Sequence, residues 1–318
     1  IVSEQKALNE VVVVGYGTEK KRDLSGSIAS VSAEDIKATP ITSFEQGLQG
    51  RVAGVQVMQG NSAPGGAPQV RIRGANTVLG GNEPLYIIDG VPVYNSELMN
   101  NNGLNVGTQP SNALASINPN DILSMDILKD ASATAIYGAR GANGVVIITT
   151  KRGKAGERGK IVFESYYGMQ EISNKLDLMG TQDYIRVVNE RTTNFGGAPT
   201  YPDPSLYKNS TDWQDFFFRR APMQNYSLNF SGGTAQNQYS ISGNWFAQDG
   251  IVQLTNFERA SLRINLDNRI NSRLKIATSL TASNSVNNRS LNYALSNAMS
   301  FSPLLSPYDS SGNFRNLN

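Results

Sequence analysis

The chain of 318 residues contains neither cysteine nor histidine. Without cysteine there are no disulfides and no thiol nucleophiles, and without histidine there is no histidine-based zinc site and no Ser-His-Asp triad. The absence of cysteine fits the cytosol and also a bacterial envelope protein that avoids oxidative pairing. We therefore expect a protein that is not an enzyme and that uses no metal and no cofactor.

A large excess of charge of either sign is also missing. Lys and Arg number 28 against 26 Asp and Glu, which leaves a formal net charge of +2. Because phosphate binding needs a marked basic excess, this balance argues against a nucleic-acid partner. At about 100–200 residues per domain, the length corresponds to roughly two domains.

Long apolar runs are absent as well, since none approaches the ~20 residues of a transmembrane helix. Residues 1–4 lack the basic start and apolar stretch of a signal peptide. Residues 312–318 carry no element that closes a fold. We therefore expect both ends to be cuts in a longer polypeptide.

Up to about residue 155 the pattern is that of a small mixed domain. Residues 27–152 alternate short strand and helix patterns with long Gly- and Asn-rich loops, notably 61–67 and 95–109. Ser32 and Ser43 each precede a short helical pattern and can cap it. This stretch predicts a compact α+β domain.

After residue 156 the hydrophobic period becomes two. Five stretches have apolar residues on one face and mostly Asn and Ser on the other: residues 161–170, 226–231, 239–245, 262–267 and 274–281. Such runs of ~10 residues are typical of an outer-membrane barrel. A soluble β-sandwich also alternates, but its outer faces would carry more Lys and Glu.

The connections between these stretches also favour a barrel. A long connection, residues 177–223, joins the first two and contains a helical pattern near 183–189. Short turns at 232–237 and 268–271 follow. Long loops on one side and short turns on the other are what outer-membrane barrels have.

Residues with obvious chemistry are few. Asp121, Asp126 and Asp130 straddle a strand and a helix start, so we interpret them as caps and turn residues rather than a metal or acid–base site. Residues 138–144 are rich in glycine but precede a strand and lack the Lys-Ser/Thr of a phosphate loop. Neither pattern predicts catalysis.

A valine-rich strand lies close to the N-terminus, where Glu10 is followed by Val11, Val12, Val13 and Val14. Four consecutive β-branched residues favour an extended backbone. One interpretation is an ordinary buried strand. The other is a strand that pairs with the sheet edge of a partner, which the polar, charged surroundings of the segment favour.

Several segments resemble the SusC/RagA-like TonB-dependent outer-membrane transporters. The segment around the four valines looks like that family's TonB box, and residues 128–145 are the strongest match to its plug domain. In family order the matching segments are residues 9–17, 48–57, 70–74, 84–92, 128–145, 225–233 and 257–265. The family's signal peptide, a preceding small β domain and most of the barrel have no counterpart here.

The resemblance implies an α+β plug domain followed by the first strands of an antiparallel transmembrane β-barrel, which has 22 strands in the family and is incomplete here. It divides the chain into a TonB-box segment and linker (1–22), a plug domain (23–155) and the start of the barrel with about five strands (156–318). The implied location is the outer membrane of a Gram-negative cell.

The function that the resemblance implies is active import of an oligosaccharide or peptide nutrient. The expected partners are TonB, through residues Glu10 to Val14, a SusD-like surface lipoprotein, the substrate and outer-membrane lipid. The alternative is a non-transporting barrel that acts as a signalling receptor or is held as a client by an assembly machine. The sequence does not identify the substrate.

Two groups of side chains are candidate contact residues. Arg71 and Arg73 alternate with apolar neighbours, so we expect them to share a strand face and to pair with carboxylates on the barrel's inner wall, for which Glu164 is available. If the chain enters its first barrel strand from the periplasm, residues 177–223 are extracellular and the two short turns are periplasmic. In that long loop, aromatic side chains could contact cargo or lipoprotein or simply pack within the loop: Tyr201, Tyr207 and Trp213.

Overall fold

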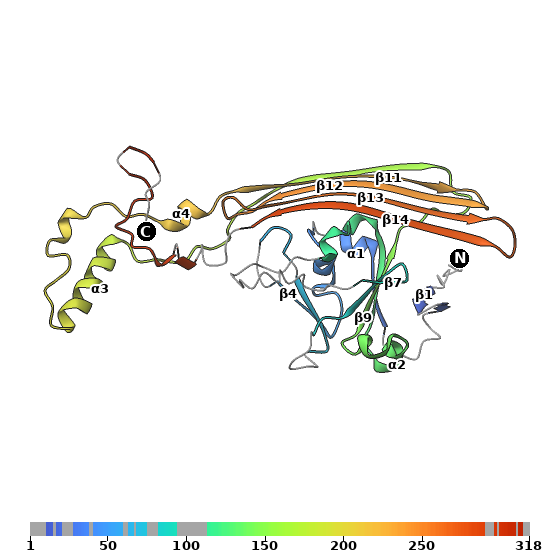
Figure 1. The fold of residues 1–318 in the computed structure, drawn as a ribbon, viewed down its shortest axis with the longest axis horizontal. Coiled ribbons are helices and arrows are strands. Elements are labelled where there is room, and N and C mark those ends of the chain that lie inside the picture. The colour runs from blue at the N-terminus through green and yellow to red at the C-terminus, as the bar shows by residue number, and fades with distance from the viewer. Residues whose placement is uncertain are drawn as a thin grey trace, which may run out of the picture.

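The computed structural model describes residues 11–14, 17–20, 28–37, 41–59, 63–66, 68–74, 82–93, 113–289, 296–297, 299–309 and 311–313. A small mixed domain lies against one face of a long, curved five-stranded sheet, and an N-terminal hairpin lies beside them (Figure 1). Glu10 and the predicted loop at 95–109 fall outside the described residues. No helix in the described part of the chain is long and apolar enough to cross a membrane.

The N-terminal valines form strand β1 (Val11–Val14), which pairs antiparallel with β2 (Gly17–Lys20). The sequence predicted the valine strand but described its surroundings only as polar and charged, without a second strand. The second strand forms because the nearest extended segment can satisfy the backbone hydrogen bonds of the first. Since this sheet has two strands, β1 pairs along one edge and its other edge has no partner strand among the described residues.

The mixed domain is built on a five-stranded sheet in which β6 (Leu85–Ile88) runs parallel to β9 (Val145–Thr150) and the other neighbours are antiparallel. A separate hairpin, β4 (Val55–Gln59) with β5 (Pro68–Ile72), lies beside it. The strands of the main sheet, in spatial order, are β3 (Ile28–Ser32), β8 (Ile122–Leu128), β9 (Val145–Thr150), β6 (Leu85–Ile88) and β7 (Val91–Val93).

Short helices complete this domain and enclose its core. The larger core cluster includes Ile36, Phe44 and Leu48, which come from two of these helices and are at most 2% exposed. The helices are α1 (Ala33–Lys37), η2 (Phe44–Leu48), η3 (Ala113–Ser116), η4 (Pro119–Asp121), α2 (Ala131–Thr134) and η5 (Ala135–Gly141). Central strand β9 is almost wholly buried, because it has a neighbouring strand on both edges and core side chains on both faces.

The two predicted helix caps differ in the structure. The Ser32 hydroxyl accepts the backbone N–H of Asp35 at 3.3 Å, and the Ser32 N–H donates to the Asp35 carboxylate at 3.1 Å, which confirms the first cap. The predicted capping hydrogen bond of Ser43 is not formed. Ser43 stands at the N-cap position of η2, but its side chain makes no capping hydrogen bond.

The second half of the chain forms an antiparallel sheet whose strands lie in chain order. The strands are β10 (Lys160–Gln170), β11 (Ala221–Gly233), β12 (Asn237–Asp249), β13 (Asn256–Arg269) and β14 (Lys275–Asn288). Apart from β10, they are longer than the alternation predicted. The backbone ladder continues through Asn, Gln and Gly residues, which the hydrophobic pattern does not register.

Burial on this sheet is the reverse of that in a soluble protein. On its outer face apolar side chains are exposed, for example Ile161 at 69% and Phe163 at 62%. On its inner face, which lies against the mixed domain (Figure 1), polar side chains such as Asn225, Ser240 and Asn265 are at most 4% exposed. An exposed apolar face and a buried polar face are the pattern of a membrane-barrel wall, and they argue against the soluble sandwich.

The two ends of the long sheet differ in their connections. The connection from β10 to β11 holds α3 (Thr181–Asn194), η6 (Pro204–Leu206) and α4 (Trp213–Phe217), and it extends beyond one end (Figure 1). Helix α3 confirms the helical pattern predicted near 183–189. The opposite end has the short turns between β11 and β12 and between β13 and β14, and the β1–β2 hairpin lies near it.

Candidate functional site

The site with the most specific contacts is the seam between the mixed domain and the inner face of the long sheet. Strand β13 supplies most of it, because alternate residues of a strand point to the same face. The side chains of β13 that point to this face and are at most 7% exposed are Phe257, Arg259, Arg263, Asn265 and Asp267. Two arginines and an aspartate are thus buried on one strand, and each needs partners.

Arg263 forms an ion pair with Asp89 through its Nη2 atom, and both side chains are less than a tenth exposed. Asp89 lies in the turn between β6 and β7, in the left-handed region with φ of 48°. Thr150 also donates to this carboxylate, through its backbone N–H at 3.0 Å and its hydroxyl at 2.6 Å. The buried charges are therefore matched, and the centre of the mixed domain is attached to β13.

Further contacts attach the chain where it leaves the mixed domain. Asn265 donates to the backbone oxygen of Lys151 at 3.0 Å, and Ser279 donates to Asn265 at 2.7 Å. Arg152 donates to both carboxylate oxygens of Asp267 at 3.2 Å. Lys275 of β14 lies 3.1 Å from the same carboxylate. The exit of the mixed domain is thus held by Asn265 and Asp267 of β13, and β14 contacts both of these side chains.

Arg259 is held differently. It is 2% exposed, and its Nη1 atom donates to the backbone oxygens of Ala115 at 2.7 Å and Ile117 at 3.0 Å. The guanidinium carbon lies 5.4 Å from the centre of the Phe246 ring, which adds a cation–π contact. These contacts connect helix η3 to the wall.

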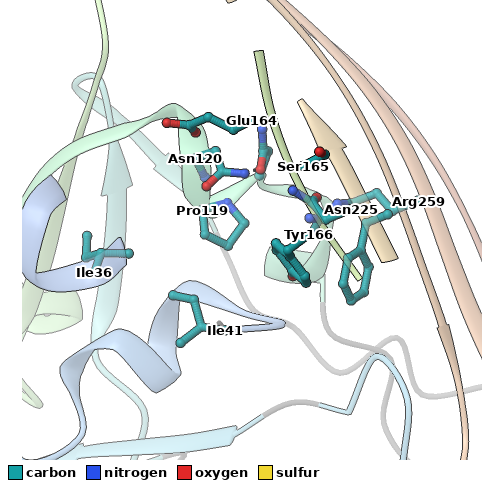
Figure 2. A pocket seen from close by; sticks show the side chains of 11 residues that line it. Ile36, Ile41, Pro119, Asn120, Glu164, Ser165, Tyr166, Asn225 and Arg259 are labelled. Atoms are coloured by element: carbon teal, nitrogen blue, oxygen red, sulfur yellow. Dashed lines mark hydrogen bonds between the residues drawn. The ribbon is translucent and has the colours of Figure 1, made fainter. Parts of the chain in front are cut away.

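A cavity of about 290 Å³ lies beside Arg259, between the mixed domain and β10–β13 (Figure 2). Ile36 and Ile41 line one side of it, and wall residues including Tyr166 and Asn225 line the other. Among the residues that line this cavity, three buried donors have no hydrogen-bond partner in the described part of the chain: the Nδ2 atoms of Asn118 and Asn225 and the Nε atom of Arg259. Donors without partners beside a cavity suit oxygen acceptors such as water, a hydroxyl or a carbonyl.

A second cavity, of about 500 Å³, continues the seam toward the end of the sheet with short turns. Asn120 and Glu164 line both cavities. The wall of the second cavity is hydroxyl- and amide-rich: Ser227, Asn229, Ser231 and Ser240. Asp121 also lines it, and burial raises the pKa of that carboxyl. The seam is therefore polar along β10 and β11.

The predicted pairing of Arg73 with the wall was wrong. Arg73 forms its ion pair with Asp130 of the same mixed domain, and its side chain is 53% exposed. The alternation that placed it beside Arg71 stops because β5 ends at Ile72 and Arg73 adopts a φ of 59°. Arg71 is half-buried on β5 and makes no ion pair in the part of the chain that the structure describes. Glu164 lies on the inner face at the seam and lines both cavities, whereas Arg73 pairs with Asp130.

The arginines that do bridge the seam are Arg259 and Arg263 on the wall and Arg152 at the domain exit. The sequence offered a signal for the first two. They fall four residues apart on the polar face of an alternating strand, where uncompensated cations need partners.

Of the three aromatic side chains predicted in the long loop, Trp213 is buried against other residues of the chain. It is 4% exposed, its ring lies 5.2 Å from that of Phe301, and its Nε1 atom donates to the backbone oxygen of Ser302 at 3.2 Å. A buried indole cannot stack on cargo, so the packing alternative holds for this residue. Tyr201 and Tyr207 pack edge to face at 5.2 Å and are half-buried.

The three aspartates form no cluster. Asp126 accepts a hydrogen bond from Ser30 at 2.5 Å, Asp130 pairs with Arg73, and Asp121 lies at the seam. The described ranges contain no group of three or more potential metal ligands. Among the predicted TonB-box residues, the structure describes the backbone of Val11 to Val14.

Comparison with known proteins gives consistent matches. Residues 20–145 match the model of the TonB-dependent receptor plug domain. TonB-dependent receptor P26 of Formosa agariphila is 43% identical over 271 residues, which are 84% of this chain and 26% of that protein. TonB-dependent receptor SusC of Bacteroides thetaiotaomicron is 35% identical over 263 residues, which are 83% of this chain and 25% of SusC. The chain therefore spans about a quarter of the length of these relatives.

A solved structure agrees with the sequence matches. The RagAB peptide importer in its open-open state superposes with a TM-score of 0.80 and 32% identity, over 96% of this chain and 36% of that chain. The mixed domain thus corresponds to a plug, and the five antiparallel strands correspond to part of a barrel wall. The chain belongs to the SusC/RagA-like TonB-dependent receptors, of which it carries the plug domain and barrel strands.

Proposed function

We propose that this chain is part of an outer-membrane importer whose plug is moved by TonB to admit an oligosaccharide or a peptide. The observation that carries the proposal is the polar seam. A domain held against the inner face of a barrel wall by ion pairs and side-chain hydrogen bonds obstructs the lumen, and the polar cavities beside it suit hydrated cargo. A barrel as wide as the family's would otherwise leave an open channel.

Coupling to TonB is proposed at β1. An unpaired strand edge can accept a strand from a partner, and main-chain hydrogen bonds then supply the affinity. The valine strand offers such an edge near the end of the sheet with the short turns. That end is the periplasmic one if the chain enters β10 from the periplasm.

Peptide is the first cargo class to test, because the RagAB relative is named a peptide importer, and oligosaccharide is the second. A SusD-like lipoprotein is proposed at the opposite end, over the connection that carries α3. Exposed apolar side chains there, such as Phe195 at 85% and Leu206 at 74%, support a partner at that end.

Growth of the host tests this function. We expect deletion of the complete gene to abolish growth on one member of a panel of peptides and glycans, and the complete gene to restore it only in cells with active TonB. Restored growth without TonB would contradict the energised mechanism. Cargo binding without uptake in TonB-active cells would favour a signalling receptor instead.

Placement in a membrane gives a prediction about the outer face. Leu228 is 51% exposed on that face, and we expect Leu228→Arg to destabilise the complete protein in a bilayer by about 2–4 kcal/mol if this position lies near the midplane. Asn229→Arg is the matched control, because the neighbouring residue lines the second cavity, where a guanidinium stays hydrated. Urea unfolding in lipid vesicles measures both, and equal costs would argue against a lipid-facing surface.

A further inference from the structure

The guanidinium of Arg259 is buried without an ion pair in the part of the chain that the structure describes. Arg263, four residues further along the same strand, is by contrast paired with Asp89. Both hydrogen bonds of Arg259 use its Nη1 atom and go to backbone oxygens, and its Nε atom has no partner among the described residues. Because a buried cation is stabilised by an anion in contact with it, one carboxylate would complete the surroundings of Arg259.

Strand register places a second donor in line with Arg259. Asn225 on β11 pairs with Phe246 on β12, and Phe246 pairs with Arg259 on β13, so the three residues form one row across the inner face. The Asn225 Oδ1 atom accepts a hydrogen bond from Asn244 at 2.7 Å, while its Nδ2 atom has no partner among the described residues. The wall therefore offers a guanidinium and an amide for the two oxygens of one carboxylate.

A side chain of opposite charge lines another side of the same cavity (Figure 2). Tyr166 on β10 pairs with Asn225 and so extends the row of Arg259, and Glu164 is the next inner-face residue on β10. Strands β10 and β13 are three spacings apart, which is about 14 Å between backbones. The cavity thus has a cation on one strand and a carboxylate on another.

The remaining lining of the cavity includes an apolar side. Ile36, Ile41 and Pro119 of the mixed domain line it, and Phe246 lines it from the wall. Its volume of about 290 Å³ is at the lower end of the range for small-molecule sites. An apolar patch together with a cation and a carboxylate suits a small amphipathic zwitterion.

We propose that this cavity binds a short peptide with free ends, with its terminal carboxylate on Arg259 and Asn225 and its terminal ammonium on Glu164. Three extended residues span about 10 Å, and charged side chains that reach inward from strands about 14 Å apart leave a gap of that order. An apolar side chain of the peptide would lie against Ile36 and Ile41. The inference rests on the proposed import of peptides and assigns residues to the two ends of the cargo.

Peptide binding by the complete protein tests the site. Isothermal titration calorimetry in detergent compares the tripeptide Ala-Leu-Ala with its C-terminal amide and with its N-acetyl form. We expect the free tripeptide to bind at least tenfold more tightly than either blocked form. The reason is that each block removes a charge from one end and with it a charge-assisted hydrogen bond.

Variants assign each end of the peptide to a side chain. Arg259→Gln should remove the preference for the free carboxylate and keep that for the free amine, and Glu164→Gln should do the reverse. Asn225→Asp keeps the shape of the side chain but puts a carboxylate beside Arg259, so it should weaken binding of the free tripeptide at least tenfold. Arg152→Gln is the matched control, because it removes a seam cation outside this cavity and should change neither preference. Thermal unfolding shows that each variant folds.

Equal affinities for the free and blocked peptides, or no binding of the free tripeptide, would overturn the proposal. So would an unchanged preference for the free carboxylate in Arg259→Gln. The growth panel reports separately on import. Growth on peptides without this end-selective binding would leave the proposed importer standing and refute the site, whereas end-selective binding without growth on any peptide would leave the site standing and refute peptide import.

Discussion

Replacing Arg263 with alanine is expected to destabilise the plug against the wall by about 3–5 kcal/mol, because the substitution leaves Asp89 as a buried carboxylate without its cation. The Thr150 hydrogen bonds remain, but neutral donors do not replace a charge. Thermal unfolding of the complete protein measures the loss, and trypsin digestion shows whether the plug becomes the accessible part.

Two further variants isolate the pair. Arg152→Ala removes a partly exposed cation from Asp267, which keeps Lys275, so we expect a loss of about 1 kcal/mol or less. The double variant Arg263→Ala, Asp89→Ala should be more stable than Arg263→Ala alone, because no unpaired charge is left. A plug that is equally stable in Arg263→Ala and Arg152→Ala would refute the assigned role of the buried pair.

Val12→Pro is expected to abolish TonB-dependent uptake without changing the amount of protein or its binding of cargo. Proline removes a backbone N–H from β1, and coupling by strand addition depends on such donors more than on side chains. Uptake of the cargo found in the growth panel, measured in cells with equal amounts of protein, gives the result.

Val12→Ala is the control for that variant, since it shortens the side chain and keeps the N–H. It should retain most of the uptake. Normal import by Val12→Pro would show that β1 is not the coupling strand. Equal damage by alanine and proline would mean that the valine side chain carries the contact instead of the backbone.

The pattern of neighbouring residues in the sequence was sufficient to predict much of the fold. The alternation from Ile161 onward predicted strands whose apolar faces are exposed, and the Ser32 cap and helix α3 also follow from neighbouring residues. These features depend on residues within a few positions of one another, where backbone propensity and side-chain period act directly.

The partners at the seam could not be predicted in the same way. Asp89 and Arg263 are 174 positions apart, and Trp213 is buried by a segment that begins 88 positions later. Arg73 does not lie on the predicted face, because its own backbone adopts a left-handed conformation directly after the end of β5. Such contacts depend on the tertiary arrangement, which the spacing of residues along the chain does not encode.

Sidedness is the most direct test, because coupling at β1 and the position of the extracellular partner both depend on it. An epitope tag at Pro204 lies in the long β10–β11 connection, and one at Thr234 lies in the short β11–β12 turn at the other end of the sheet. With the complete protein in intact cells, we expect antibody to bind the Pro204 tag, and to bind the Thr234 tag only after the outer membrane is permeabilised. The reverse labelling would contradict the proposed orientation and with it the assignment of β1 to the periplasm.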